Sequence, residues 1–241
     1  MEASKSRLVG SSPLRVLGGI PGRRSKLLPR YQHVVDKLWE RPRARGERVF
    51  VSDLESVIQQ RLAARKRRVY EERRWRRAAV LVPLYSTSEG PFVLFTKRTD
   101  TVEHHKGQIS FPGGAADPTD PDALTTALRE TQEELGIAPH DVKVLGALDD
   151  VPTVVSGFVI TPFVGIVPHP YPLRISPVEI AEVLFVPLAI FQDPSKMRVE
   201  ERDRDGERVQ VYFYYHGPHE IWGATARIMK SLVDTVFGDQ P

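Results

Sequence analysis

Apolar residues recur with two different periods along the chain, and each period predicts its own kind of element. Two runs rich in aliphatic and aromatic residues, 78–85 and 92–97, flank a polar turn segment and are typical of strands. Similar runs return at 142–148, 158–167, 182–187 and 209–215. Helical spacing is found instead at 53–72 and from residue 223 or 224 to 237. The pattern predicts an α/β domain.

A further helix, ending near Gly136, has an unusual charge pattern. Glu130, Glu133 and Glu134 stand at spacing i, i+3, i+4, so they share one side of the helix within an arc of roughly 100°. The opposite side of the helix is expected to pack on a core, because it holds Leu124, Leu128, Thr131 and Leu135. Clustered carboxylates repel one another unless a cation lies among them, and hard divalent cations prefer such oxygen ligands. The pattern therefore predicts a metal site.

The ends of this acidic helix are also indicated by the sequence. Asp120 is expected to be the N-cap, because Pro121 follows it and proline is favoured at the first helical position. Gly136 is expected to end the helix in the left-handed conformation. Upstream, Phe111-Pro112-Gly113-Gly114 indicates a strand that ends in a tight turn. A strand, a loop and an acidic helix form a frame suited to a metal-bound phosphate.

This segment resembles the signature of the Nudix hydrolases. That signature consists of a glycine, then a glutamate, then the run R-E-U-x-E-E-x-G-U at fixed spacing, where U is an apolar residue. The matching residues are Gly114, Arg129, Glu130, Glu133, Glu134, Gly136 and Ile137. The spacing from Gly114 to Arg129 is one residue too long, Asp120 replaces the first glutamate, and Thr131 fills an apolar position.

These departures match a variant found in the coenzyme A diphosphatases, which resembles G-G-x-x-D-x-x-D followed by T-A-L-R-E. The matching residues are Gly113, Gly114, Asp117, Asp120, Thr126, Ala127, Leu128, Arg129 and Glu130. A second pattern of that subfamily, L-L-T-x-R-S followed by R-x-H-x-G-x-V-x-F-P-G-G, is similar to residues 94–114, with agreement at Arg98, His105 and Gly107. Thr99 replaces its serine, and Glu103 replaces its first downstream arginine, which reverses a charge.

The resemblance implies a Nudix α/β/α sandwich with a mixed sheet and a bound Mg²⁺ or Mn²⁺. It implies Glu130, Glu133 and Glu134 as the metal ligands and as catalytic residues. Arg129 is expected to form an internal ion pair that holds the loop and helix together. In this superfamily the general base comes either from the signature helix or from a later loop. Glu182 is the preferred candidate, with Glu179 as the alternative in that loop.

The resemblance also implies hydrolysis of a diphosphate linkage in a nucleotide-type substrate. Residues expected to contact that substrate are Lys97, Arg98, His105, Lys106, Gly113 and Gly114. Coenzyme A or acyl-coenzyme A is the expected substrate, with adenosine 3′,5′-bisphosphate and (acyl-)4′-phosphopantetheine as products. ADP-ribose, NADH and nucleoside triphosphates remain alternatives, because fold resemblance does not separate them. Residues 222–227 resemble the closing segment of the subfamily, and Trp222 is expected in the core.

Charge is divided unevenly along the chain, although the net charge is only +3. Residues 1–77 hold 21 of the 34 Lys and Arg and 8 of the 31 Asp and Glu, so their net charge is +13 and that of the remainder is −10. We therefore expect a basic extension over 1–48, a basic helix on the flank of the core over 49–76, and the Nudix domain over 77–241. The basic part is suited to contact with nucleic acid, anionic lipid or an acidic partner surface, and it indicates, as a function of another class, a nucleotide-sensing or nucleic-acid-binding module. A solvated charged surface is the simpler interpretation.

The remaining composition narrows the setting. The absence of cysteine excludes disulfides and thiolate chemistry and is compatible with the cytoplasm. No apolar run approaches the ~20 residues of a membrane helix. Because the first 30 residues hold seven basic residues and one acid, a mitochondrial transit peptide is the alternative in a eukaryote. A homodimer is a further expectation from the superfamily, although no residue here indicates it.

Overall fold

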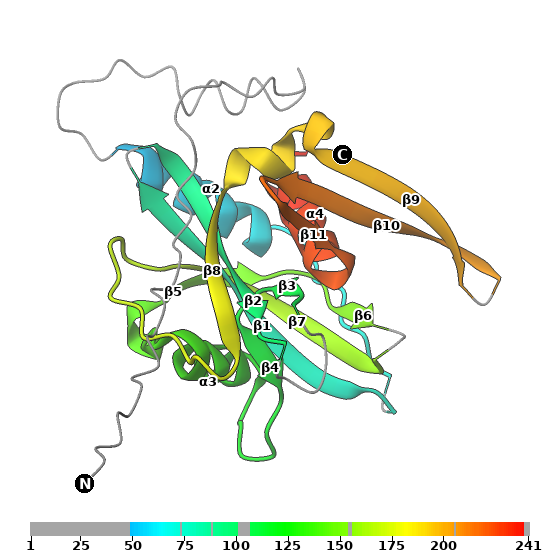
Figure 1. Cartoon of the computed structure of the whole chain (residues 1–241), viewed down its shortest axis with the longest axis horizontal. Helices are drawn as coiled ribbons and strands as arrows, with labels where there is room; N and C mark the ends of the chain where they lie inside the picture. Colours follow the sequence, from blue (N-terminus) through cyan, green and yellow to red (C-terminus); the bar gives the residue numbers. More distant parts are fainter. Residues whose placement is uncertain are drawn as a thin grey trace, which may run out of the picture.

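A mixed sheet forms the centre of the computed structural model, which describes residues 49–72, 74–87, 89–100, 107–153, 156–204 and 206–238 (Figure 1). Within these residues the sheet has eight strands: β1 (Arg76–Thr87), β2 (Gly90–Arg98), β3 (Ile109–Ser110), β4 (Gly113–Ala115), β5 (Lys143–Ala147), β6 (Val151–Thr153), β7 (Phe158–Ile166) and β8 (Ile180–Pro187). Strand β1 runs parallel to β7 and antiparallel to β2, which makes the sheet mixed.

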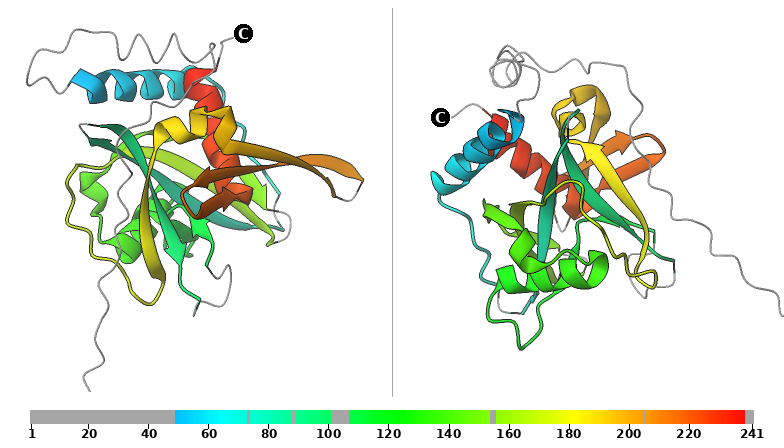
Figure 2. Two further views of the ribbon diagram at one scale, coloured as in Figure 1. Left: turned by 45° about the horizontal axis from the view of Figure 1, so that its top comes forward. Right: turned by 90° about the vertical axis from the view of Figure 1, so that its left-hand side faces the viewer.

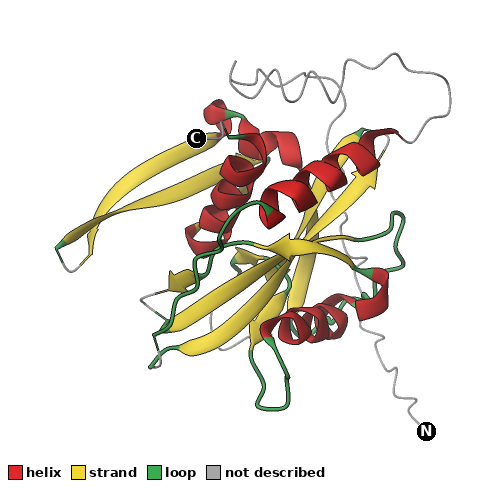
Figure 3. Ribbon diagram, turned by 180° about the vertical axis from the view of Figure 1, so that it is seen from behind, coloured by secondary structure: helices red, strands yellow, loops and turns green. Residues whose placement is uncertain are grey.

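Helices cover both faces of this sheet, as Figures 2 and 3 show. Helix α3 (Ala123–Leu135) lies on one face, and α2 (Val49–Ala63) and α4 (Gly223–Phe237) lie on the other. The described residues also form three short 3-10 helices. η1 (Pro139–Asp141) connects α3 to β5, and η2 (Leu188–Gln192) and η3 (Pro194–Lys196) lie between β8 and β9. The α/β/α sandwich is thus confirmed. None of the helices in the described ranges is long and apolar enough to cross a membrane.

A second, three-stranded sheet follows β8 and lies beside α4. It consists of β9 (Met197–Arg204), β10 (Glu207–His216) and β11 (His219–Trp222), and the β9–β10 ribbon projects from the body of the protein (Figure 1). Trp222, which we expected in the core, is 40% exposed, because it stacks on Phe213 on the outer face of this sheet. Only the strand at 209–215 was predicted here.

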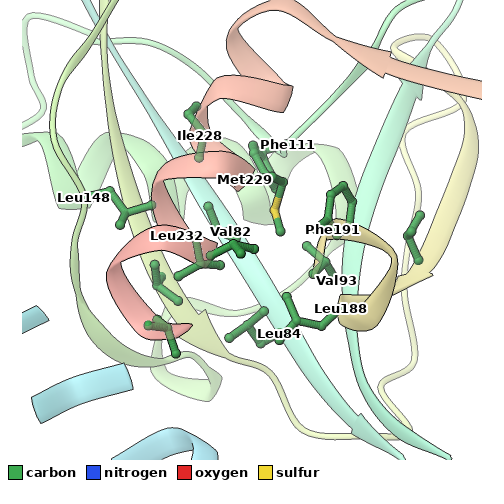
Figure 4. Close-up of a cluster of buried hydrophobic side chains, with 14 of the residues drawn as sticks. Val82, Leu84, Val93, Phe111, Leu148, Leu188, Phe191, Ile228, Met229 and Leu232 are labelled. Atoms are coloured by element: carbon green, nitrogen blue, oxygen red, sulfur yellow. The ribbon is translucent and has the colours of Figure 1, made fainter. Parts of the chain in front are cut away.

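Two hydrophobic cores lie on the two faces of the main sheet, and strand alternation assigns each side chain to one of them. Val93 and Phe95 of β2 point into the core that contains α2 and α4, part of which is drawn in Figure 4. Leu94, between them, points into the core that contains Leu135 of α3. This alternation determines which residues of β2 and β8 can reach the acidic helix.

Helix α2 begins and ends earlier than the predicted helix over 53–72. Its apolar stripe, Leu54, Ile58 and Leu62, is buried in the core beside α4. Beyond Ala63 the chain becomes extended, because its backbone is bound elsewhere. The amides of Arg68 and Tyr70 donate to the carboxylates of Asp149 and Asp150, each at 2.9 Å.

The same two aspartates also engage the side chains of the basic segment that follows α2. Arg65 pairs with Asp149, and Arg67 pairs with Asp150. Asp150 is only 1% exposed and also accepts a hydrogen bond from Thr161 Oγ1 at 2.8 Å. These arginines are therefore occupied inside the protein, which weakens their use as a nucleic-acid-binding surface. Residues 1–48, which carry the rest of that prediction, lie outside the described residues.

Replacing Asp150 by alanine should destabilise the protein strongly. The change leaves Arg67 and the amide of Tyr70 without their buried acceptor, and breaking a buried pair typically costs about 3–5 kcal/mol. Asp149→Ala is the matched control, because that carboxylate is more exposed and should cost about 1 kcal/mol. Urea unfolding of both variants checks the difference, and equal losses would contradict the role given to Asp150.

Candidate active site

Helix α3 presents the acidic residues, and its first turn differs from the prediction. The N-cap is Asp122, whose carboxylate accepts a hydrogen bond from the amide of Thr125 at 2.7 Å. The prediction that Asp120 caps the helix was therefore wrong by two residues. The prediction for Gly136 is confirmed, because it ends the helix with φ of 71°.

Asp120 instead holds the loop before α3 against the helix. Its carboxylate accepts hydrogen bonds from Nε and Nη2 of Arg129, both at 3.0 Å, and from Oγ1 of Thr126 at 2.8 Å. These donors, with Arg129 first, hold the pKa of Asp120 well below its usual range. The same hydrogen bond is the main reason that the pKa of Arg129 is raised. Arg129 is thus fixed between the loop and the helix.

The three glutamates of α3 differ in exposure, although they share one side of the helix. Glu133 is 57% exposed, Glu130 is half-buried, and Glu134 is only 3% exposed. Nη1 of Arg129 lies 2.8 Å from Oε1 of Glu130 and 3.1 Å from Oε2 of Glu133. The acidic side of the helix is therefore only partly exposed to solvent, with Glu133 at the surface and Glu134 buried in the protein.

Burial raises the pKa of Glu134 to about 8. Arg98, whose Nη1 lies 3.8 Å from Oε1 of Glu134, opposes this shift, as does a hydrogen bond from the amide of Gly113. The charges of Glu179 and Glu130 raise the pKa further. The pKa of Glu130 is also raised, chiefly by burial, against the opposing effect of Arg129. In the metal-free protein the site therefore resists holding all its negative charge.

Gly113 and Gly114 lie in strand β4, which pairs with β1, rather than in the predicted tight turn, and β4 lies directly against these carboxylates. Gly113 adopts φ of 149°, and a Cβ there would collide with the backbone of Ala79 and Val80 on β1. A Cβ on Gly114 would lie 2.5 Å from the carboxyl carbon and from Oε2 of Glu130. The second glycine is thus required because the carboxylate of Glu130 occupies the space that a side chain would need.

We expect Gly114→Ala to lower kcat by roughly 10²-fold, because an added methyl group displaces the carboxylate of Glu130, which is expected to be catalytic, and a shift of ~1 Å in a catalytic group has an effect of that size. Steady-state kinetics with the substrate named below provides the measurement. Ala116→Ser, at an exposed position two residues away, is the control and should behave as wild type. Normal turnover by Gly114→Ala would show that Glu130 need not occupy its observed place.

The side chains present fit a divalent metal ion. In the described part of the chain, no three metal-binding side chains are gathered closely enough, as they stand, to hold an ion. However, Oε2 of Glu134 is buried without a hydrogen-bond partner, which is uncommon for a buried polar atom. Glu130 and Glu133 supply further oxygen donors on the same side of the helix, and such donors suit Mg²⁺ and Mn²⁺. A bound cation would give Oε2 of Glu134 a partner and would reduce the repulsion between the three carboxylates.

The two candidate bases lie in different surroundings. Glu179 is close enough to the acidic helix for its charge to raise the pKa of Glu130 and of Glu134. Its carbonyl accepts from the amide of Thr99 at 2.9 Å, which fixes this loop beside the end of β2. The structure does not bring Glu182 to that cluster. Glu182 alternates with Val183, which packs in the α3-side core, so its side chain points to the other face of the sheet.

The predicted cationic residues divide in the same way. Arg98 lies on the α3 face with Glu134, whereas the side chain of Lys97 lies across the sheet, where Nζ is 3.9 Å from Oε2 of Glu182. His105, Lys106 and the substituted Glu103 lie outside the described residues. The sequence analysis missed His219, whose Nε2 lies 3.7 Å from Oε1 of Glu182. No local pattern marks it, since its position depends on how β11 packs near β3.

Comparison with known proteins identifies the family. The family model of the NUDIX domain matches residues 75–205. A protein from Photorhabdus laumondii named Uncharacterized Nudix hydrolase NudL is 37% identical over 188 residues, which cover 78% of this chain and 98% of that protein. A protein of the same name from Escherichia coli is 38% identical over 157 residues, which cover 65% of this chain and 81% of that protein.

Similar solved structures include a Nudix hydrolase from Alicyclobacillus acidocaldarius, which is 21% identical with a TM-score of 0.44 and covers 66% of this chain and 91% of its own. A MutT/nudix family protein from Enterococcus faecalis is 16% identical with a TM-score of 0.43, and covers 83% of this chain and 72% of its own. The family assignment rests on the sequence matches. Because the domain match spans more than half of the chain and the relatives named Nudix hydrolase share over a third of the aligned residues, the chain belongs to the Nudix hydrolase family and is a hydrolase.

Proposed function

We propose that the protein is a metal-dependent diphosphatase that cleaves coenzyme A or acyl-coenzyme A. The observation that carries the metal dependence is the buried carboxylate of Glu134, which has an oxygen without a partner and shares its helix side with Glu130 and Glu133. The substrate follows from the resemblance of residues 94–114 and 113–130 to the two patterns of the coenzyme A diphosphatases. The products are adenosine 3′,5′-bisphosphate and (acyl-)4′-phosphopantetheine.

Nudix hydrolases use divalent metal ions, and here Mg²⁺ or Mn²⁺ is proposed, held by Glu130, Glu133 and Glu134. A bound divalent ion neutralises the diphosphate and lowers the pKa of the attacking water. Arg129 keeps the helix and the preceding loop in register through Asp120. Arg98 balances the charge of Glu134 and lies where a phosphate oxygen can approach it. Gly113 leaves room for the backbone of β1 and Gly114 leaves room for the Glu130 carboxylate, so their proposed contact with the substrate is made through backbone atoms.

We propose Glu179, in place of Glu182, as the residue that accepts the proton of the attacking water. Its support is its electrostatic contact with Glu130 and Glu134, whereas Glu182 faces Lys97 and His219. A positioned general base contributes typically about 10²–10⁴-fold.

Glu179→Gln should therefore lower kcat by about 10²-fold or more, and Glu182→Gln by much less. The two substitutions remove the same charge from neighbouring positions, so each is the control for the other. Measurement of kcat against pH adds a second readout, because loss of a base also removes its limb of the profile. A larger loss in Glu182→Gln would restore Glu182 as the base.

The substrate proposal is tested by product analysis with a panel of coenzyme A, acetyl-coenzyme A, ADP-ribose, NADH and nucleoside triphosphates in Mg²⁺ or Mn²⁺. A kcat/KM for coenzyme A or its thioester well above that for the other compounds supports it. A preference for ADP-ribose or NADH would instead show that the charge reversal at Glu103 goes with a different substrate.

A further inference from the structure

A second polar cluster lies on the sheet face opposite α3 and consists of Lys97, Glu182 and His219. Lys97 of β2 and Glu182 of β8 are register partners in adjacent antiparallel strands, so their side chains emerge side by side. His219 of β11 approaches from the three-stranded sheet and is 10% exposed. Three distant parts of the sequence thus meet at the end of β2.

The C-terminal part of the chain holds His219 in this place. Ile221, two residues further on β11, is buried, so strand alternation turns His219 inward as well. Thr225, at the start of α4, donates from Oγ1 to the carbonyl of Ile109 at 3.1 Å. Ile109 is itself the register partner of Lys97. The segment 222–227, which resembles the closing segment of the subfamily, therefore fixes β11 beside β3 and next to Lys97.

The polar groups of this cluster are close but incompletely paired. The separations of Glu182 from Lys97 and from His219, 3.9 Å and 3.7 Å, are too long for hydrogen bonds. Nε2 of His219 makes no hydrogen bond although the ring is nine-tenths buried. Arg129, by contrast, is fully engaged with Asp120 and its neighbouring glutamates. Lys97 and His219 are therefore held ready to receive another acceptor.

An anion is the acceptor that fits two nitrogen donors beside a single carboxylate. Lys97 and Arg98 are consecutive residues, about 3.8 Å apart at Cα, and their side chains leave opposite faces of β2. A substrate whose diphosphate lies at Glu134 can therefore extend past the end of β2 to the second cluster. What would reach it is a phosphate group separate from the diphosphate that is cleaved.

We propose that Lys97 and His219 form a phosphate subsite that recognises a phosphate outside the scissile diphosphate. Under the proposed function, on which this inference rests for its substrate, that group is the 3′-phosphate of coenzyme A. Glu182 orients the two donors and limits how tightly they hold the anion, since its charge repels phosphate. The subsite selects substrates with an additional phosphate over those that carry the diphosphate alone.

Binding of two nucleotides tests the subsite without relying on turnover. Adenosine 3′,5′-bisphosphate and AMP differ by one phosphate, and titration calorimetry of the full chain in Mg²⁺ gives the Kd of each. Wild type should prefer the bisphosphate by roughly 10- to 100-fold, as expected for one or two charge-assisted hydrogen bonds. Lys97→Met and His219→Phe should each reduce that preference about tenfold, whereas His219→Gln, which restores an N–H near Nε2, should recover part of it.

Glu182→Gln gives a result in the opposite direction. Removing the repelling charge should strengthen binding of the bisphosphate by severalfold while AMP binding changes less. Lys143→Met, which removes an exposed lysine on β5, is the matched control for Lys97→Met and should preserve the preference. Melting temperatures of all variants identify those that are simply unfolded.

A wild-type protein that binds both nucleotides equally would overturn the subsite, as would a preference that survives in both Lys97→Met and His219→Phe. The catalytic counterpart is the ratio of kcat/KM for coenzyme A to that for 3′-dephospho-coenzyme A, which should fall in the same variants. Failure of the proposed function is seen separately, as absence of coenzyme A turnover with the nucleotide preference intact. In that case the ratio of kcat/KM for NADPH to that for NADH tests the subsite, because these two substrates also differ by one phosphate outside the diphosphate.

Discussion

Replacing Glu134 by glutamine is expected to reduce turnover by about 10³-fold or more while the fold remains intact. Glutamine keeps the shape of the side chain and accepts the hydrogen bond from the amide of Gly113, but it removes the carboxylate proposed to bind the metal. Loss of a ligand to a catalytic metal removes several kcal/mol of charge stabilisation from the transition state. Steady-state kinetics and circular dichroism of the variant check both parts of the expectation.

The same substitution should change how stability depends on pH. Because burial raises the pKa of Glu134 from 4.5 to about 8 in the folded protein, the unfolded chain releases this proton first as the pH rises. Between those pH values the folded state binds more protons, so the wild type without metal loses stability as pH rises and has lost all of this contribution above pH 8. Glu134→Gln has no such proton and should show a flatter profile.

Thermal melting between pH 6 and 9 in the presence of a chelator gives this comparison. Addition of Mg²⁺ or Mn²⁺ at pH 8 should raise the melting temperature of the wild type and not that of Glu134→Gln. Glu201→Gln, at an exposed position on β9, controls for the loss of one carboxylate. Near-normal turnover by Glu134→Gln, or an equal response of both proteins to metal, would remove Glu134 from the metal site.

Replacing Ile58 by alanine should destabilise the protein by about 2–5 kcal/mol, the usual cost of truncating a buried isoleucine. Ile58 is completely buried between the sheet and α4, although α2 lies before residues 75–205, which the NUDIX domain match covers. For a chain of this size the loss corresponds to a fall in melting temperature of roughly 5–15 °C. Helix α2 is thus expected to be an integral part of the folded unit.

Differential scanning calorimetry of Ile58→Ala measures this effect. Gln59→Ala is the matched control, because that side chain is exposed on the same helix turn and alanine favours helix formation. A melting temperature within about 2 °C of wild type for Ile58→Ala would show that α2 rests on the domain without supporting it.

The sequence predicted those parts of the fold that have a strong local signal. The positions of β1, β2 and α4 and the end of α3 at Gly136 follow from periodicity and from a residue that tolerates φ of 71°. The single strand predicted at 111–114 is instead two short strands, β3 and β4, on either side of Phe111 and Pro112, because two or three residues are too few to show a period. Asp120 was mistaken for a cap because its pairing with Arg129 is nine residues away and competes with local preference.

Features that depend on the packing of distant segments could not be read from the sequence. Helical spacing places Glu134 with Glu130 and Glu133, but its burial beside β4 and Arg98 depends on how distant strands pack against the helix. Likewise, the choice between Glu179 and Glu182 depends on the register of β8 against β2. The arginines after α2 were interpreted as surface charge because their partners, Asp149 and Asp150, lie more than 80 residues further along the chain.

The most direct test of the account is incubation of the purified full chain with coenzyme A in Mg²⁺, with the products separated by chromatography and identified by mass. We predict equimolar adenosine 3′,5′-bisphosphate and 4′-phosphopantetheine, no product when the metal is chelated, and restored turnover when Mg²⁺ or Mn²⁺ is added back. Intact coenzyme A under all of these conditions, or cleavage that continues at full rate in the presence of the chelator, would contradict the proposed metal-dependent diphosphatase.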